Sequence, residues 1–305
     1  MKKNFDLIII GAGPAGLSAA IYAVRAGLDV AVFEKMFAGG QIVSTYEMEN
    51  YPGFVDAVTG PDLAYKFEAH ARKFGVHIIY EGISEILTNG DEKIVKTSKG
   101  EYFAKGIILA MGANPKPLGI AREKQLIGSG VAYCASCDGA FYKGKDVAVV
   151  GGGNTAVEDA LFLAKFCSKV YLIHRRDVLR ADAIIAKRVA AEPKIVKVFD
   201  SVVTEILGDK VESITVENVK TGFLENIAVS GLFVAVGTAP QTALVKDLVK
   251  LSKSGHIITD EEMRTSVARV YAVGDIREKV LRQVITAAAD GAIAATVFAN
   301  EVNFL

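Results

Sequence analysis

The chain has 305 residues, of which 51% are hydrophobic, so it is long enough to form two domains with packed cores. Thirty-five basic residues balance thirty-five acidic ones, which leaves no net field to hold nucleic acid or an anionic membrane surface. The amino terminus lacks the long apolar stretch of a signal peptide, and three cysteines are too few for a structural disulfide framework. We therefore expect a cytoplasmic protein that binds neither nucleic acid nor a membrane.

The first predicted elements surround a glycine-rich turn. Residues Phe5 to Ile10 predict a buried parallel strand, which leads directly into Gly11-Ala12-Gly13-Pro14-Ala15-Gly16. Residues Ala15 to Ala26 predict a helix, and Asp29 to Glu34 predicts a second strand. This order is typical of a dinucleotide site, where glycines let the backbone approach a pyrophosphate at the helix N-terminus. Glu34 stands where a carboxylate accepts hydrogen bonds from a ribose 2′-hydroxyl.

Further strands and a turn-rich crossing follow. The segments Ile94 to Thr97 and Ile107 to Met111 predict antiparallel strands added to the first sheet. The segment Gly112 to Pro117 is rich in turn formers and prolines, so we expect the chain to cross there into a second domain.

A CxxC pair, Cys134-Ala135-Ser136-Cys137-Asp138, lies in the second domain immediately before its glycine-rich unit. This spacing suits a redox disulfide or half of a zinc site. Zinc is disfavoured, because the other Cys and His residues are not paired at ligand spacing. Asp138 could exchange a proton with a departing thiolate, or merely cap the next turn. The remaining ligand candidates are Cys167, at the end of an apolar helix and expected to be a buried inert thiol, and His70, His77, His174 and His256.

A second glycine-rich unit comes next. Asp146 to Val150 predicts a strand, Thr155 to Phe166 a helix, and Lys169 to His174 another strand, with Gly151-Gly152-Gly153-Asn154-Thr155-Ala156 at the first turn. The second strand ends in a basic run and not in an acid, with Arg175, Arg176 and Arg180. Guanidinium groups bind phosphate bidentately, which favours NADPH over NADH; a solvated basic turn is the alternative.

The remaining chain is expected to return to the first domain. Ser213 to Val219 and Gly231 to Val236 predict antiparallel strands, and Gly237 to Pro240 predicts the second crossing. A strand from Val270 then ends in Gly274-Asp275 and precedes Arg282-Gln283. Asp275 could bind the ribityl chain of a flavin.

An apolar helix is predicted near the end of the sequence. The run Val284 to Ala299 contains Asp290 and is shorter than the roughly 20 residues that span a bilayer, so we expect a buried helix. Its positive dipole end could stabilise an anionic reduced flavin.

Together these patterns predict an α/β fold with two Rossmann-like, three-layer ββα nucleotide-binding domains. The expected FAD-binding domain is discontinuous, comprising residues 1–114 and 243–305. The expected NADPH-binding domain, residues 115–242, carries the CxxC and is inserted into it. Two dinucleotide sites beside a redox disulfide indicate a tightly held flavin, an exchanging nicotinamide, and electron transfer from one to the other.

Over essentially its whole length the sequence resembles the low-molecular-weight, bacterial-type thioredoxin reductases, which are FAD- and NADPH-dependent pyridine nucleotide-disulfide oxidoreductases. The motifs in family order are Gly11 to Gly16, Gly39-Gly40-Gln41, Glu49-Asn50-Tyr51-Pro52-Gly53, Cys134 to Asp138, Gly151 to Ala156, His174 to Arg180, Gly274-Asp275 and Arg282-Gln283.

The resemblance implies a role for each matched residue. It implies that Cys137 is the sulfur nearest the flavin, that Cys134 exchanges with thioredoxin, and that Asp138 is the acid/base group, with no metal. The implied FAD residues are Gly11, Gly13, Pro14, Ala15, Gly16, Glu34, Lys35, Gly39, Gly40, Gln41, Asn50, Gly274, Asp275, Arg282, Gln283 and Val284. The implied NADPH residues are Gly151, Gly153, Asn154, Thr155, Ala156, His174, Arg175, Arg176 and Arg180.

The resemblance also implies a cytoplasmic homodimer whose inserted domain rotates. The predicted function is thioredoxin-disulfide reduction by NADPH through FAD and the Cys134/Cys137 pair. One alternative keeps the fold but serves a glutaredoxin-like protein or a small dithiol. Another is a nucleotide-binding regulator or zinc-stabilised scaffold without turnover, which would need the CxxC to be reduced and metal-bound.

Overall fold

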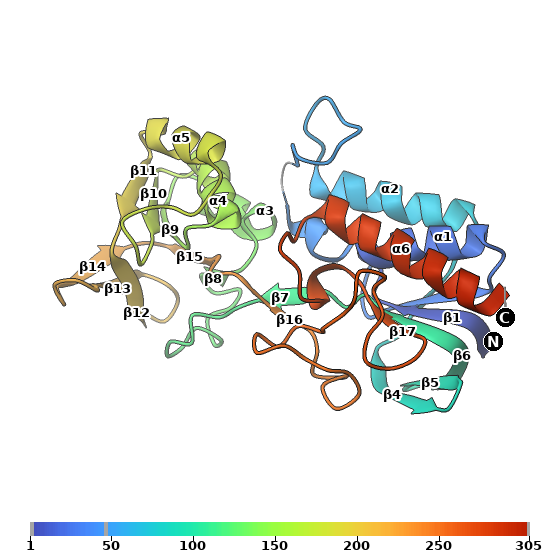
Figure 1. Cartoon of the computed structure of the whole chain (residues 1–305). Coiled ribbons are helices and arrows are strands. Elements are labelled where there is room, and N and C mark those ends of the chain that lie inside the picture. The colour runs from blue at the N-terminus through green and yellow to red at the C-terminus, as the bar shows by residue number, and fades with distance from the viewer. Residues whose placement is uncertain (1–2, 46–47, 304–305) are drawn as a thin grey trace. The chain divides into compact units, whose positions relative to one another are not determined.

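The computed structural model describes residues 3–45 and 48–303 and divides the chain into two compact units (Figure 1). Unit 1 comprises Met1–Asn114 and Pro240–Leu305, and unit 2 comprises Pro115–Ala239. Unit 2 is therefore inserted into unit 1. The two connecting segments, β7 (Ala113–Pro115) and β16 (Thr238–Pro240), pair as a two-stranded sheet.

Unit 1 is built on a mixed sheet with the strand order β3-β2-β1-β6-β5-β4, and β17 also pairs with β6. The strands β3, β2, β1 and β6 run parallel, as does β17 against the end of β6. The strands β5 and β4 form an antiparallel extension. The strand bounds are β1 Asn4–Ile10, β2 Val30–Glu34, β3 His77–Tyr80, β4 Ile83–Asn89, β5 Glu92–Thr97, β6 Gly100–Leu109 and β17 Val270–Ala272.

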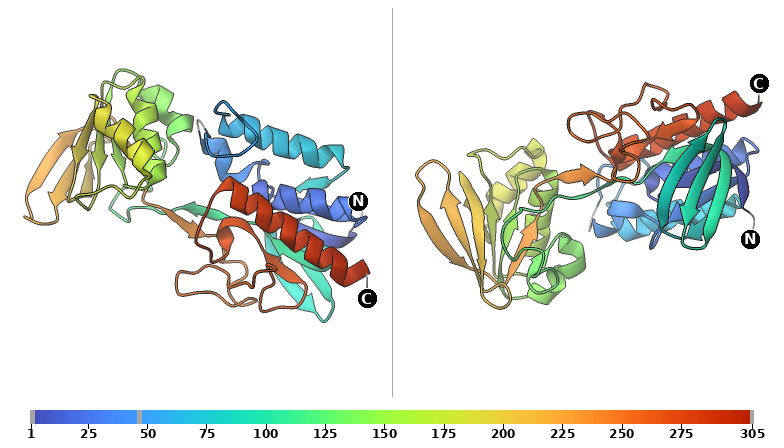
Figure 2. Two further views of the ribbon diagram at one scale, coloured as in Figure 1. Left: turned by 45° about the horizontal axis from the view of Figure 1, so that its top comes forward. Right: turned by 90° about the horizontal axis from the view of Figure 1, so that it is seen from below.

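Three helices lie along one side of this sheet, as the two views in Figure 2 also show. They are α1 (Pro14–Arg25), α2 (Gly60–Lys73) and α6 (Val284–Asn303). Alternate residues of β1 point to opposite faces, so Leu7 packs among α1 and α6 while Ile8 packs into a second cluster on the other face. Short 3₁₀ turns occupy Gly40–Ser44 and Gly274–Ile276.

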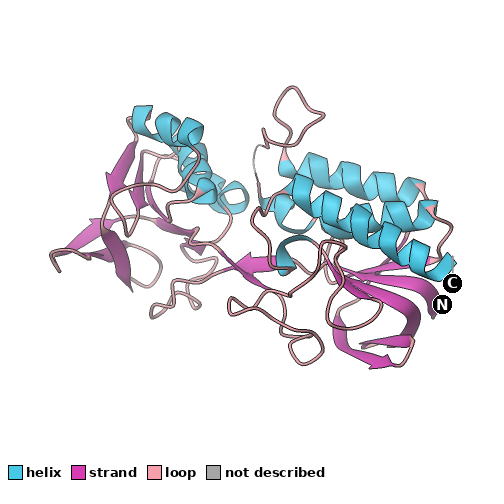
Figure 3. Ribbon diagram, in the orientation of Figure 1, coloured by secondary structure: helices cyan, strands magenta, loops and turns pink. Residues whose placement is uncertain are grey.

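Unit 2 has three layers (Figure 3). Its central sheet is entirely parallel, in the order β11-β10-β9-β15-β8. One hydrophobic cluster joins this sheet to α4 and α5, and another joins it to the antiparallel sheet β12-β13-β14. The bounds are β8 Val131–Ala132, α3 Ala135–Asp138, a 3₁₀ turn Gly139–Tyr142, β9 Asp146–Val150, α4 Asn154–Ala164, β10 Lys169–Ile173, α5 Ala183–Ala191, β11 Ile195–Val198, β12 Ser201–Leu207, β13 Ser213–Asn218, β14 Leu224–Ala228 and β15 Gly231–Val234.

The predicted fold class, α/β with two Rossmann-like units, is confirmed. Two predicted strand directions are wrong: β15 pairs parallel with β8 and β9, and the end of β6 pairs parallel with β1 and β17. Both segments are buried on both faces, as parallel strands are, and their short apolar runs do not reveal direction. The predicted helix from Val284 is confirmed as α6. Within residues 3–45 and 48–303, no helix is long and apolar enough to cross a membrane.

Candidate active site

The first glycine-rich turn lies in unit 1 between β1 and α1, where the backbone is too crowded for larger residues. Gly11 has a φ of +106°, and a Cβ there would lie 2.4 Å from the Ala110 carbonyl oxygen. A Cβ on Gly16 would lie 1.9 Å from the Gly11 oxygen, so this glycine lets α1 approach the strand end. Gly13 begins α1 without a side-chain cap, so the N-terminus of α1 offers backbone N–H donors to a phosphate.

Glu34, at the end of β2, turns its carboxylate back to this turn. Its Oε2 accepts the Ala12 N–H at 2.9 Å, and its Oε1 accepts the Lys35 N–H at 2.7 Å. The Gly39 N–H donates to the Ala12 oxygen at 2.8 Å, which brings the Gly39-Gly40 segment to the same turn. The structure thus gathers an acid and a second pair of glycines around the N-terminus of α1.

Segments far apart in the sequence converge on this region. A Cβ on Gly274 would lie 3.0 Å from the Ala15 Cβ, so the turn after β17 packs against the start of α1. The Asn50 side-chain amide donates to the Gln283 Oε1 at 3.2 Å. Gln41 donates its side-chain amide to the Ala113 oxygen. Val284 is buried beside Ile42, Met48, Val58, Leu63 and Ala64.

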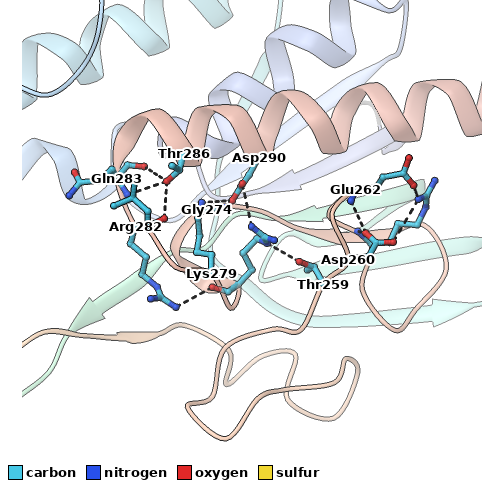
Figure 4. A network of polar contacts seen from close by, with 12 residues as sticks. Thr259, Asp260, Glu262, Gly274, Lys279, Arg282, Gln283, Thr286 and Asp290 are labelled. Carbon is cyan, nitrogen blue, oxygen red and sulfur yellow. Dashed lines mark hydrogen bonds and ion pairs between the residues drawn. The ribbon is translucent and has the colours of Figure 1, made fainter.

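Two charged groups in this region suit a polar ligand. Burial raises the pKa of Asp275, although Lys279 and Arg282 oppose that shift. The Arg282 Nε is buried and has no acceptor among residues 3–45 and 48–303, while its Nη2 donates to the Arg277 oxygen at 3.4 Å (Figure 4). A buried donor without a partner is costly unless a ligand supplies an acceptor. The uncapped helix, the crowded glycines and this donor fit a flavin dinucleotide.

The second glycine-rich turn, in unit 2, repeats this arrangement. Gly151 has a φ of +151°, and a Cβ there would lie 2.3 Å from the Ala235 oxygen. Gly153 begins α4 without a side-chain cap, which again leaves N–H donors at a helix N-terminus. Asn154 is held by Asp182: its amide donates to Asp182 Oδ2 at 2.8 Å, and its Oδ1 accepts the Asp182 N–H at 2.9 Å.

The basic run after β10 divides into a buried histidine and exposed arginines. His174 packs over Gly152, and within the described part of the chain its Nε2 has no hydrogen-bond partner. Burial, and after it the charge of Arg180, lowers the pKa of His174. The lowered pKa favours the neutral ring, in which one nitrogen donates and the other accepts a hydrogen bond. Arg175, Arg176 and Arg180 are exposed, and the Arg180 N–H donates to the Gly152 oxygen at 2.6 Å. Three exposed guanidinium groups beside a glycine turn fit a phosphorylated ribose.

The CxxC cysteines form a disulfide, with their Cα atoms 5.3 Å apart. Cys134 caps α3, and its Sγ accepts the Cys137 N–H at 3.0 Å. Cys137 is exposed and Cys134 is half-buried. Asp138 ends α3, and its charge adds to the effect of burial in raising the pKa of Tyr142. The structure therefore places both sulfurs and the predicted acid within one turn.

The sequence patterns did not identify Glu123, a buried residue whose hydrogen bonds hold the segment that precedes this disulfide. Glu123 is 1% exposed, and its carboxylate accepts the Leu118 and Gly119 N–H groups, both at 2.8 Å. It also accepts the hydroxyl of Tyr133 at 2.7 Å, one residue before Cys134. These contacts fix the chain as it enters the CxxC. No short-range pattern in the sequence marks Glu123 as the partner of Tyr133.

Two glycine-rich turns at helix N-termini and a disulfide on one chain fit one class of protein: a dinucleotide-dependent disulfide oxidoreductase. The profile of the pyridine nucleotide-disulphide oxidoreductase family matches residues 5–291. The thioredoxin reductase of Peptoclostridium acidaminophilum is 46% identical over 303 residues, which are 97% of this chain and 96% of the relative. That of Bacillus subtilis strain 168 is 43% identical over 296 residues, with 96% and 93% coverage.

Solved structures agree with these relatives. The crystal structure of Lactococcus lactis thioredoxin reductase (FR conformation) has a TM-score of 0.95 and 42% identity, and covers 98% of this chain and 100% of that one. The chain belongs to the pyridine nucleotide-disulphide oxidoreductase family, in its thioredoxin reductase group.

Proposed function

We propose that this protein is a thioredoxin-disulfide reductase, which transfers two electrons from NADPH through FAD and the Cys134–Cys137 disulfide to oxidised thioredoxin. The observation that carries the proposal is a disulfide at the start of α3 in a chain that also has two uncapped glycine-rich helix N-termini. Relatives named thioredoxin reductase match nearly the whole length of the chain, which supports the same choice.

In unit 1, the residues around α1 would hold FAD. The α1 N-terminus with Gly11, Gly13, Pro14, Ala15 and Gly16 would bind the pyrophosphate, because its backbone donors have no side-chain cap. Glu34 would accept from the ribose, and Asp275 would hydrogen-bond the ribityl chain. Bound there, FAD would supply a two-electron carrier between nicotinamide and disulfide. The other proposed FAD residues are Lys35, Gly39, Gly40, Gln41, Asn50, Gly274, Arg282, Gln283 and Val284.

In unit 2, the residues around α4 would hold NADPH. The α4 N-terminus would bind the pyrophosphate, and the exposed arginines would bind the 2′-phosphate. No carboxylate stands at the end of β10 to repel that phosphate. The proposed NADPH residues are Gly151, Gly153, Asn154, Thr155, Ala156, His174, Arg175, Arg176 and Arg180.

The reduced cysteine pair would perform the exchange with thioredoxin. The Cys134 sulfur attacks one sulfur of the thioredoxin disulfide, which forms a mixed disulfide and releases one thioredoxin thiolate. The Cys137 sulfur then attacks Cys134, re-forming the Cys134–Cys137 bond and releasing the second thiolate. The Cys137 N–H, which reaches Cys134 at 3.0 Å in the disulfide, favours a thiolate at Cys134. Asp138 would give and take back the proton in the two half-cycles.

We also propose that the protein acts as a cytoplasmic homodimer. A reducing compartment suits a dithiol that must cycle. The exposed side of α1 and α6 carries Tyr22 and Ile293, which are 47% and 40% exposed. They line a shallow apolar pocket of about 290 Å³ with Ala292, Thr296 and Val297, and an apolar face of this kind suits a second copy of the chain.

Anaerobic titration of the yellow protein, first with NADPH and then with thioredoxin, tests the electron route. Wild-type protein should lose its flavin absorption with NADPH, regain it with oxidised thioredoxin, and respond less to NADH. In Cys137→Ser, NADPH should still reduce the flavin, because the change lies after that step, but thioredoxin turnover should fall to background.

A matched control is Cys167→Ser, which changes a cysteine outside the pair and should keep thioredoxin turnover. Thioredoxin reduction by Cys137→Ser at the wild-type rate, or loss of flavin reduction by NADPH in that variant, would contradict the proposed route. A colourless protein that cannot be reconstituted with FAD would contradict the function itself.

A further inference from the structure

A buried ionic cluster lies inside unit 1, between α6 and the turn that follows β17. At its centre, the Asp290 side chain is 8% exposed and projects from α6 toward this turn (Figure 4). The Lys279 Nζ lies 2.7 Å from Asp290 Oδ2, and the Arg277 Nη1 lies 3.4 Å from Oδ1. The cations are themselves 7% and 13% exposed. One buried carboxylate therefore pairs with two largely buried cations.

The third contact of Asp290 is with the backbone of the turn. Its Oδ2 also accepts the Gly274 N–H at 2.9 Å, a bond between residues sixteen positions apart. Gly274 has a φ of +74°, and a Cβ there would lie 3.0 Å from the Ala15 Cβ, so the turn needs glycine at this position. Asp290 thus links α6 to the residue that directly precedes Asp275.

The helix that carries Asp290 is itself fixed in place. A Cβ on Gly291 would lie 2.1 Å from the Ala15 oxygen, so α6 meets α1 there at backbone distance. The Ser18 hydroxyl donates to the Ala288 oxygen at 2.7 Å and adds a second tie between the two helices. A carboxylate on a helix held this closely can position a turn, because its own Cα has little freedom to move.

The cations extend the cluster to the entry of α6. The Arg277 Nε donates to the Thr259 hydroxyl at 2.8 Å, and the Arg277 oxygen accepts from Arg282. Two acids, Asp275 and Asp290, thus stand among Arg277, Lys279 and Arg282. Removing the Asp290 charge would leave two buried cations without their carboxylate, an arrangement that costs far more than losing an exposed ion pair.

We propose that Asp290 is a positioning residue for the flavin: it fixes the Gly274–Asp275 turn and balances the charge of Arg277 and Lys279 beside it. This inference rests on the proposed function, because it assumes that the turn binds FAD. If Asp290 had a purely structural role, removal of either Asp290 or Lys279 would lower the stability of the protein and its affinity for flavin alike. Charge balance predicts in addition that removing the acid and removing a cation shift the flavin midpoint potential in opposite directions.

The test uses Asp290→Asn, Lys279→Gln and, as control, Glu301→Gln. Glu301 lies on the same helix and bonds Arg264 at 3.0 Å, about 16 Å along the axis from Asp290. We expect Asp290→Asn to raise the FAD dissociation constant at least tenfold. It should also raise the flavin midpoint potential, because the loss of a negative charge favours the anionic reduced flavin. Lys279→Gln should lower the potential, and Glu301→Gln should change neither quantity.

Three outcomes overturn the proposal: Asp290→Asn with FAD affinity within twofold of wild type, Asp290→Asn without an upward potential shift, or Asp290→Asn and Lys279→Gln with shifts of the same sign. If Asp290→Asn does not fold, the test rests on Lys279→Gln, because in that variant Asp290 still contacts Arg277 and Gly274. An unchanged or raised flavin midpoint potential in Lys279→Gln then overturns the proposal. Wild-type protein that binds no flavin refutes the proposed function, whereas flavin-binding wild type with an unaffected Asp290→Asn refutes only this inference.

Discussion

At the scale of single residues, the three cysteines differ through their surroundings. Cys167 is 1% exposed, packs in the cluster around α4, and donates its thiol to the Tyr142 oxygen at 3.4 Å. Burial raises the pKa of this thiol to about 11. Cys134 and Cys137 instead lie at the start of a helix with an N–H donor directed at sulfur. A thiolate is the reactive form, so these environments separate an inert thiol from a reactive pair.

Alkylation by iodoacetamide at pH 8 measures this difference. At that pH a thiol with a pKa near 11 is ionised in about one molecule in a thousand, and the raised pKa keeps Cys167 protonated until the solution is strongly alkaline. We expect no label on the native oxidised protein, two labels after mild reduction, and a third only after unfolding in denaturant. Mass spectrometry of tryptic peptides reads the positions. Labelling of Cys167 in the folded protein would show that its site opens readily.

The sequence predicted residues whose signal is local and missed those whose partners are distant. The CxxC spacing and both glycine-rich turns are contiguous patterns, and the disulfide and the tight turns are present in the structure. In the sequence, Asp290 was recognised only as a charged residue that interrupts an apolar run. Its partners in the Gly274–Lys279 loop are defined by how α6 docks, which no short pattern encodes. Glu123 was missed for the same reason.

At the scale of elements, α1 and α6 meet at backbone distance, since a Cβ on Gly291 would lie 2.1 Å from the Ala15 oxygen. We expect Gly291→Ala to lower the free energy of unfolding by roughly 1–3 kcal/mol, because the new methyl group would meet the α1 backbone. The helix propensity of alanine, worth about 1 kcal/mol over glycine, offsets only part of that cost. Urea unfolding followed by circular dichroism measures the change.

The matched control is Gly82→Ala, where the nearest atom to the new Cβ is the flexible Lys35 side chain at 3.7 Å. That variant should stay within about 0.5 kcal/mol of wild type. Equal stability of the two variants would mean that α6 can shift away from α1 without loss of stability.

The strands show the limit of sequence patterns at this scale. The position of β15 was predicted correctly, but its direction was predicted wrongly.

At the scale of the whole molecule, each unit has its own interior. Of the five hydrophobic clusters among residues 3–45 and 48–303, three draw only on unit 1 and two only on unit 2. The crossings predicted near residues 112–117 and 237–240 fall at the segments that connect the units. A region with a closed core and adjacent ends meets the physical requirements for folding alone.

Excision of unit 2 tests that independence. Residues 115–239 expressed alone should unfold cooperatively and bind NADPH more tightly than NADH, since core and glycine turn are both retained. The remaining halves can be joined by a short turn, because the Gln241 N–H donates to the Gly112 oxygen at 3.0 Å, and this protein should bind FAD and be yellow. Neither piece alone should pass electrons from NADPH to thioredoxin, because each lacks one cofactor site. A fragment 115–239 without cooperative unfolding would show that its two clusters need unit 1 for stability.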